Sequence, residues 1–353
     1  MSIVDVAKLA GVSSSTVSRV INDDPRVAIQ TAQTVRRAMR KLNYTPSDRR
    51  PGPKPGSRTA RANVAFLVLG TSGDCSTPGF EGLLRGVSAG AWANNLNLTF
   101  NFVPDVEHLP LRALERGIDG LLLHGALPGP DLRMHLERLP AVWLMGNRCR
   151  PDWGDQVMPN SYTIGELAAN HLVGRGHRNL AFLGVGTRSS WFMRVRAMAF
   201  EHFARDAGAE EVLILDGAAE HAMWNDYWRG DGLAHCVPAM LDRLLSHSPR
   251  PSGMFVAEDR LMPHVDAALA ERGLNADGGD GDARIELISC NNERAYLLGL
   301  RTVPAEIDIH VDLIGRRGIE QLLWRLRNPS APDRVCAMIE PSLLDPSSLR
   351  SGN

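Results

Sequence analysis

Residues 3–22 read IVDVAKLAGVSSSTVSRVIN, a stretch that predicts two short helices joined by a tight turn. The first helix is expected over Ile3–Ala10 and ends before Gly11, because glycine takes the positive φ that such a turn requires. Ser13 stands where an N-cap belongs, directly before the second helix. Apolar residues at helical spacing predict a third helix over residues 29–42, so the N-terminal segment is expected to be all-α.

The second helix of this pair has two chemically different faces. Val17, Val20 and Ile21 fall together on one side, which is expected to pack in a small core. The opposite side presents small hydroxyl groups around Arg19. Serines let a helix approach DNA bases closely in the major groove, and an arginine can donate two hydrogen bonds to one guanine. The alternative is an ordinary solvated helix face, but the turn, the cap and the basic surroundings favour contact with DNA.

The charges are distributed unevenly along the chain. The whole protein has a net charge of -1, yet residues 1–61 hold 12 Lys or Arg against four acids, which gives this segment +8 and leaves -9 for the rest. A basic end on a mildly acidic body is typical of proteins that bind a polyanion, since phosphate binding releases counterions.

Residues 46–62 differ in character from the segments on either side. This stretch is rich in proline, glycine and basic residues, and it contains the sequence RRPGPKPG at residues 49–56. Prolines at this density prevent a packed helix or a central strand. We therefore expect an extended basic linker between the helical segment and the remainder of the chain.

From Asn63 onward, apolar runs alternate with amphipathic helical patterns, which is typical of a doubly wound α/β architecture with parallel sheets. A chain of 353 residues also exceeds what a single core usually supports. Strands are predicted at residues 64–69, 120–123, 142–145, 180–183, 212–215, 253–256 and 285–288, and helices at residues 80–93, 164–173, 196–207 and 311–326.

Several ordered motifs carry a resemblance to the lactose-repressor (LacI) family of bacterial regulators. The segment from Ile3 to Asn22, followed by Val27, Thr31 and the Leu-Asn-Tyr of residues 42–44, resembles the DNA-binding headpiece of this family. Further on, HLVGRGHRNLAFLG at residues 171–184 is similar to the family's motif at the entry to its second lobe. Shorter similar motifs stand at residues 255–259 and 288–292, so the resemblance extends, more weakly, to about residue 345.

The resemblance implies a helix-turn-helix headpiece followed by a two-lobed domain like that of periplasmic sugar-binding proteins, in which the chain crosses between the lobes three times. The expected divisions are residues 1–45 for the headpiece, 46–62 for the linker and 63–349 for the two-lobed domain. Its first lobe is expected to comprise residues 63–159 plus 293–328, and its second lobe residues 160–290 plus 331–349.

The resemblance also implies a function. We expect a sequence-specific DNA-binding transcription regulator, a repressor in the commonest case, that acts as a homodimer on a near-palindromic operator in double-stranded DNA. A small-molecule effector, a sugar or sugar derivative, is expected to bind between the lobes and to control DNA binding. The resemblance implies no enzymatic activity, and we expect no cofactor and no metal.

The headpiece residues expected to contact DNA follow from the same resemblance. Those at base-reading positions are Ser14, Ser15 and Arg19, and those expected to hold phosphates or to fix the docking of the helix are Ser13, Thr16 and Asn22. The sequence departs from the family at Ala28, where a serine usually caps the third helix, and the loss is expected to cost about 1 kcal/mol of local stability.

A second departure concerns the linker, which in the family forms a short hinge helix with a leucine that wedges into the minor groove. Here the corresponding residues contain no leucine and cannot be helical. One hypothesis is that Arg49, Arg50 and Lys54 lie along the minor groove as an extended arm. The alternative is a flexible tether that adds salt-dependent affinity without sequence preference, and the sequence does not decide between them.

Arg196 is the strongest effector candidate, because it matches an effector-contacting arginine of the family and can form a fork to a hydroxyl pair or a carboxylate. The alternative for Arg196 is a surface side chain on an amphipathic helix. Asn291 and Glu258 are further effector candidates, at positions where many relatives carry an acid and an asparagine, respectively. The alternative for both residues is that they only cap strand ends. Core packing is the alternative for the aromatic candidates. The remaining effector candidates are Asp259, Trp224, Trp191 and Phe80.

Other classes of protein fit the sequence less well. It lacks a phosphate-binding Gly-Lys-Ser loop, a paired-histidine metal motif and a serine nucleophile elbow, and the glycines at 184 and 186 form only a partial dinucleotide loop. The leading alternatives are a solute-binding protein without its export signal, which would not need residues 1–45, and an α/β enzyme with an appended DNA module, which would turn over a sugar.

The remaining sequence features bear on compartment and redox chemistry. Five scattered cysteines match neither a disulfide framework nor a zinc site, and we interpret them as buried thiols. The sequence contains no apolar run long enough to span a membrane and no recognisable signal segment, so a cytoplasmic protein is expected.

Overall fold

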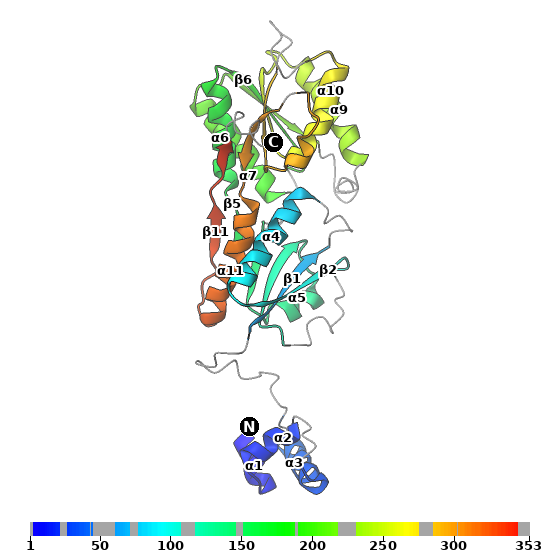
Figure 1. Cartoon of the computed structure of the whole chain (residues 1–353), viewed down its shortest axis with the longest axis vertical. Coiled ribbons are helices and arrows are strands. Elements are labelled where there is room, and N and C mark those ends of the chain that lie inside the picture. Colours follow the sequence, from blue (N-terminus) through cyan, green and yellow to red (C-terminus); the bar gives the residue numbers. More distant parts are fainter. Residues whose placement is uncertain are drawn as a thin grey trace. The chain divides into compact units, whose positions relative to one another are not determined.

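The computed structural model divides the chain into two compact units, Met1–Ala60 and Arg61–Asn353, each of which is described by itself (Figure 1). No helix among the described residues combines the length and the apolar character needed to cross a lipid bilayer. The residues that the structure describes are 3–21, 27–42, 44, 61–70, 77–106, 117–145, 151–187, 190–217, 231–274, 285–301 and 303–344.

The first unit contains the three helices that the sequence predicts, α1 (Ile3–Ala10), α2 (Ser14–Ile21) and α3 (Ile29–Lys41). They enclose a small core in which Val17 and Val20 are buried, so the apolar side of α2 faces inward as expected. The headpiece fold therefore rests on one face of α2, and the other face remains available.

Each lobe of the second unit is built on a sheet of six described strands (Figure 1). The first sheet is parallel throughout, in the order β11-β5-β4-β3-β1-β2. Its strands are β1 (Asn63–Leu69), β2 (Asn97–Val103), β3 (Gly120–Gly125), β4 (Ala141–Leu144), β5 (Asp155–Pro159) and β11 (Cys336–Ile339).

The second sheet has the order β12-β10-β9-β8-β6-β7 and is parallel except for β12, which runs antiparallel to β10. Its strands are β6 (Asn179–Gly184), β7 (Glu211–Asp216), β8 (Gly253–Val256), β9 (Glu286–Cys290), β10 (Ala305–Asp308) and β12 (Ser342–Leu344). All seven strands predicted from apolar runs are therefore present, because a parallel strand covered on both faces reads as a continuous apolar segment.

Helices cover both faces of each sheet. Along β1, Val64, Phe66 and Val68 pack under α4 (Pro78–Ala93) and α11 (Val311–Arg327), while the alternate residues pack toward α5 (Pro130–Leu136). The second sheet is covered on one face by α6 (Ser161–Gly174) and α7 (Trp191–Asp206), and on the other by α9 (Asp231–Ser246) and α10 (Met262–Glu271).

The chain passes between the two sheets at three places, which lie next to Asn160, His310 and Glu340. These crossings are joined by hydrogen bonds, since Asn160 Nδ2 donates to Glu340 Oε1 at 2.8 Å and Ser342 Oγ lies 3.0 Å from His310 Nε2. We expected residues 293–328 in the first lobe and residues 331–349 in the second. In the structure, β10 pairs within the second sheet and β11 within the first. A short apolar strand carries no signal that says which of two neighbouring sheets it joins.

The cysteines that the structure describes differ in exposure. Cys290 is buried and Cys236 is half-buried, but Cys336 is exposed. The prediction of buried thiols is therefore wrong for Cys336, which begins the edge strand β11 and so lacks a neighbouring strand on one side.

Glycines bring the backbones of α4 and α11 into direct contact. A Cβ at Gly86 would lie 2.0 Å from the carbonyl oxygen of Asp312, and one at Gly315 would lie 2.5 Å from the carbonyl oxygen of Leu83. Because both neighbours are backbone atoms, a side chain here can be accommodated only by moving a helix.

We expect Gly86→Ala to lower the free energy of unfolding by about 2–3 kcal/mol, because overpacking outweighs the gain in helix propensity. Urea denaturation followed by tryptophan fluorescence reports on the second unit alone, since every tryptophan lies beyond residue 61. Gly174→Ala is the matched control, because a Cβ at Gly174 meets nothing within 4 Å and should leave stability equal or slightly higher. Equal stability of the two variants would contradict the close packing.

Candidate DNA-binding and effector sites

The turn between α1 and α2 is held by backbone and side-chain bonds that the local sequence provides. Gly11 has a φ of 64°, and Val12 N donates to Ala7 O at 3.1 Å. Ser13 then caps α2 as predicted, with its Oγ accepting from Thr16 N at 3.1 Å. The turn thus fixes the direction in which α2 leaves α1.

The outer face of α2 presents a compact group of hydroxyls. Ser13 Oγ lies 2.7 Å from Ser15 Oγ and 2.9 Å from Thr16 Oγ1. Ser13, Ser14, Ser15 and Arg19 are exposed, and Thr16 is half-buried. The residues predicted to contact DNA that the structure describes therefore lie together on one face of α2. The other predicted DNA-contacting residues lie outside the described residues; they are Asn22, Arg49, Arg50 and Lys54.

The third helix of the headpiece begins without a side-chain cap. Ala28 occupies the N-cap position and makes no side-chain hydrogen bond, in agreement with the expected departure at this residue. The same helix carries four exposed basic side chains, which extend the positive surface of the unit; they are Arg36, Arg37, Arg40 and Lys41.

In the second unit, the effector candidate Arg196 is buried, with only 3% of its surface exposed. Its Nη1 donates to Ala257 O at 2.8 Å and to Asn291 Oδ1 at 3.4 Å, and its guanidinium lies over the Phe192 ring at 5.7 Å. The alternative of a surface arginine on an amphipathic helix is therefore excluded.

Asn291 connects Arg196 to the acids that follow β9. It stands directly after the strand with a φ of 121°, a conformation that L-residues seldom adopt. Its side chain also bonds the carboxyl of Glu293. Since Ala257 follows β8 and Asn291 follows β9, these groups meet at the carboxyl ends of parallel strands, where α/β sheets usually bind ligands.

Glu258 and Asp259 take different roles although they are adjacent. Glu258 forms an ion pair with Arg260, with 2.8 Å between Oε2 and Nε, and both side chains are only 10% exposed. Asp259 is fully buried, and its Oδ2 accepts from Glu293 N at 2.7 Å. The carboxylate of Glu258 is thus paired with the guanidinium of Arg260.

A second buried carboxyl, Glu306 on β10, faces Asp259. Burial, together with the charge of Glu306, holds the pKa of Asp259 well above its usual range. Burial likewise raises the pKa of Glu306 to about 7. Neither oxygen of Glu306 has a donor among the described residues, so the contact between these two acceptors requires a proton between them.

The aromatic candidates lie in different surroundings. The Phe80 ring is half-buried in the first lobe and packs with Phe66 at 6.1 Å and with Phe100 at 6.0 Å between centroids. Trp191 is half-buried at the first residue of α7, and Trp224 lies outside the described residues. Core packing thus occupies much of the Phe80 ring.

Three residues of this cluster were not predicted from the sequence, namely Arg260, Glu293 and Glu306. A usable signal existed for the first two, since each follows an apolar run by only a few residues, at the end of a sheet where ligands bind. Glu306 gave no such signal, because its short strand was not predicted.

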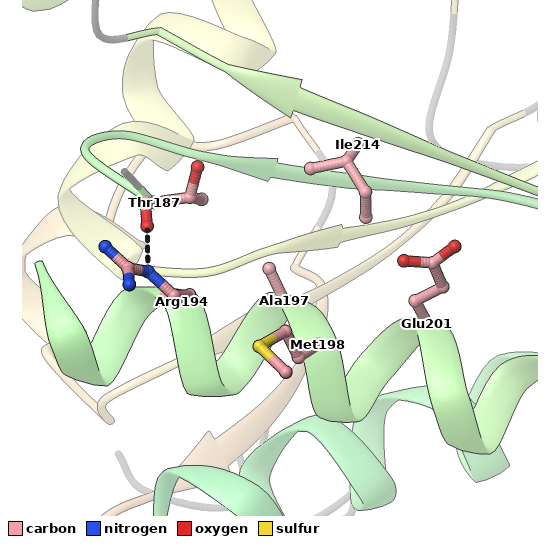
Figure 2. Close-up of a pocket in the computed structure, with 6 residues that line it drawn as sticks. All are labelled: Thr187, Arg194, Ala197, Met198, Glu201 and Ile214. Carbon is pink, nitrogen blue, oxygen red and sulfur yellow. Dashed lines mark hydrogen bonds between the residues drawn. The ribbon is translucent and has the colours of Figure 1, made fainter. Parts of the chain in front are cut away.

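A groove of about 360 Å³ lies between α7 and β7, and Arg196 is not among the residues that line it (Figure 2). Figure 2 shows Met198 and Glu201 on α7 opposite Ile214 on β7, with Arg194 bonded to the carbonyl of Thr187. None of the predicted effector residues lines this groove.

Comparison with known proteins identifies both parts of the chain. Residues 2–47 match the family described as bacterial regulatory proteins, lacI family, and residues 169–348 match the periplasmic binding protein-like domain. The chain is 29% identical to the HTH-type transcriptional repressor PurR of Mannheimia succiniciproducens over 351 residues, which cover 97% of this chain and 96% of that protein. It is also 29% identical to the ribose operon repressor of Escherichia coli, over 92% of this chain and 93% of the repressor.

The fold is similar to that of the Lac repressor dimer bound to operator and the anti-inducer ONPF. The TM-score is 0.60 at 19% identity, and the match covers 98% of both chains. At this level of identity the likeness concerns the fold alone. Together with the family matches, it confirms the predicted helix-turn-helix unit followed by two α/β lobes with parallel sheets.

The buried pair of carboxyls predicts that stability falls as pH rises. Between the ordinary glutamate pKa and about 7, folded Glu306 keeps a proton that the unfolded chain has lost, so raising the pH through this window lowers the free energy of unfolding. Glu306→Gln should remove much of this dependence, as measured by urea denaturation from about pH 5 to about pH 8. Glu81→Gln, at an exposed residue, is the control. An unchanged pH dependence in Glu306→Gln would show that the proton is held elsewhere.

Proposed function

This chain belongs to the lacI family of bacterial regulatory proteins, and we propose that it is a transcription repressor. In this proposal, a small molecule bound between the two lobes controls the affinity of the protein for its operator. Family membership makes it a DNA-binding transcription regulator rather than an enzyme, as the sequence predicted. The single observation that carries the proposal is the exposed hydroxyl face of α2 around Arg19, supported by an apolar face that packs in the headpiece core.

In this proposal α2 enters the major groove of double-stranded DNA. Ser14, Ser15 and Arg19 read base edges, while Ser13, Thr16 and Asn22 hold phosphates or fix the docking. The basic residues of the linker, Arg49, Arg50 and Lys54, follow the minor groove as an arm. The protein acts in the cytoplasm as a homodimer on two operator half-sites, by analogy with the similar Lac repressor, which is a dimer bound to operator.

The effector in this proposal is a sugar or sugar derivative, by analogy with the similar ribose operon repressor. Arg196 and Asn291 offer it a charged fork and an amide at the carboxyl ends of β8 and β9. Asp259 and the Glu258–Arg260 pair border this position. Trp191, Trp224 and Phe80 are the proposed aromatic contacts.

Loss of the Arg19 side chain should remove sequence discrimination rather than DNA affinity in general. Genomic footprinting of the wild-type protein, with and without a carbohydrate panel, identifies the operator. We then expect Arg19→Ala to reduce the ratio of operator to random-duplex affinity about 5-fold to 150-fold, the range of one bidentate base contact. Arg37→Ala, at an exposed residue of α3, should weaken both duplexes about equally. Failure of wild-type protein to discriminate any genomic duplex would end the repressor proposal.

Arg196→Lys tests the effector site. Lysine keeps the charge but loses the planar fork, so we expect at least about a tenfold loss of affinity for the active compound of the panel. Isothermal titration calorimetry measures the affinity, and operator binding without the compound should be retained. Arg194→Lys is the control on the exposed side of the same helix. Equal affinities in all three proteins would place the effector elsewhere.

A further inference from the structure

A hydrogen bond joins the two lobes directly. Gly79 N, in the first turn of α4, donates to Oε1 of Glu293 at 2.8 Å. Gly79 belongs to the first lobe, and Glu293 follows β9 of the second. We propose that Glu293 is an interlobe latch, a carboxylate of one lobe that caps a helix of the other and thereby sets how far the lobes are closed.

The first turn of α4 is capped by two residues of different origin. The side chain of Thr77, the N-cap, accepts from Phe80 N at 3.2 Å, and Pro78 has no N–H to satisfy. The amide N–H of Gly79 has no acceptor in its own helix and donates to Glu293. A carboxylate at this position also gains from the positive end of the helix dipole, so the first lobe supplies half of the cap and the second lobe supplies the other half.

Glu293 is held in place from its own side. Only 7% of its surface is exposed, and its backbone N–H donates to the buried carboxyl of Asp259. Burial and the charge of Glu258 raise the pKa of Glu293, while the bond from Gly79 acts in the opposite direction. Separation of the lobes would therefore break a hydrogen bond to a buried carboxyl and replace it by contact with water.

The chain has a glycine at the one position where this approach needs it. A Cβ at Gly79 would lie 2.4 Å from Glu293 Oε1, which is closer than real Cβ atoms come to a neighbour. A side chain at position 79 would therefore force the Glu293 carboxylate to shift away from the Gly79 amide. The glycine therefore belongs to the same contact as the hydrogen bond and gives a variant, Gly79→Ala, that perturbs it from the first lobe.

The latch is connected to the proposed effector site by a short relay. Asn291 bonds the carboxyl of Glu293 and accepts from Arg196, so the three side chains form a chain that ends at the α4 amide. A ligand that engages Arg196 or Asn291 changes the donors available to Glu293. This part of the inference rests on the proposed function, whereas the latch itself does not.

Hydrogen exchange of the full-length protein, without effector or DNA, tests the latch. In Glu293→Ala we expect the Gly79 amide to exchange about tenfold faster, in keeping with the loss of a hydrogen bond to a charged acceptor. Glu293→Gln keeps an acceptor oxygen and should restore part of the protection. Glu81→Ala, which removes an exposed acid from the same helical turn, should change nothing at Gly79.

Two further variants separate a latch from a general stabiliser. Gly79→Ala should speed exchange in the first turn of α4, including Phe80 and Glu81, because its Cβ displaces the carboxylate. Asn291→Gly, which tolerates the φ of this position, should raise exchange at Gly79 by a smaller factor if the relay operates. Unchanged Gly79 exchange in Glu293→Ala overturns the proposal, and so does faster exchange throughout both sheets. Because no ligand or DNA is present, neither result bears on the repressor proposal.

Discussion

The backbones of α4 and α11 touch at Gly86 and Gly315, and the architecture of the second unit depends on this contact. In the sequence, α4 belongs to the early part of the first lobe, most of the second lobe follows, and α11 then returns to the first lobe. This close backbone contact packs two helices that are distant in sequence side by side on the same face of one sheet. Farther along α11, Arg325 makes a bidentate pair with the buried Asp155 on β5, which fixes the end of the helix to the sheet.

The same discontinuity creates the path by which the lobes influence each other. The three crossings are tied together near Asn160, His310 and Glu340, and each lobe keeps its own core, so the proposed switch would bend the chain at these crossings. Such motion is the hinge type common in two-lobed binding proteins. Because α11 begins directly after the crossing at His310 and is packed against α4, the proposed latch at the first turn of α4 is joined to this crossing by two packed helices.

Sequence patterns predicted the elements whose cause is local. The seven apolar strands and the capped turn at Gly11 and Ser13 depend on neighbouring residues, and they appear where expected. Strands β2, β5, β10, β11 and β12 were not predicted. Two of them, β5 and β10, contain the buried acids Asp155 and Glu306, whose partners lie far away in the sequence. Glu293 follows an apolar run, which is a usable signal, but its contact with Gly79 spans 214 residues and could not be predicted from neighbouring residues. Arg196 and Asn291 were found only because motifs resembled a family.

The cluster of buried acids behind the proposed effector site lowers the stability of the fold, so its presence calls for an explanation. Asp259, Glu293 and Glu306 are buried, and burying a carboxyl group lowers stability unless it is paired or hydrogen-bonded. A network of this kind is satisfied in one arrangement of protons and donors, and it loses more than one bond when a member moves. Such a network therefore disfavours intermediate arrangements of its members. In the proposed regulator, where ligand contacts would select between two lobe arrangements, that property would favour an all-or-none response.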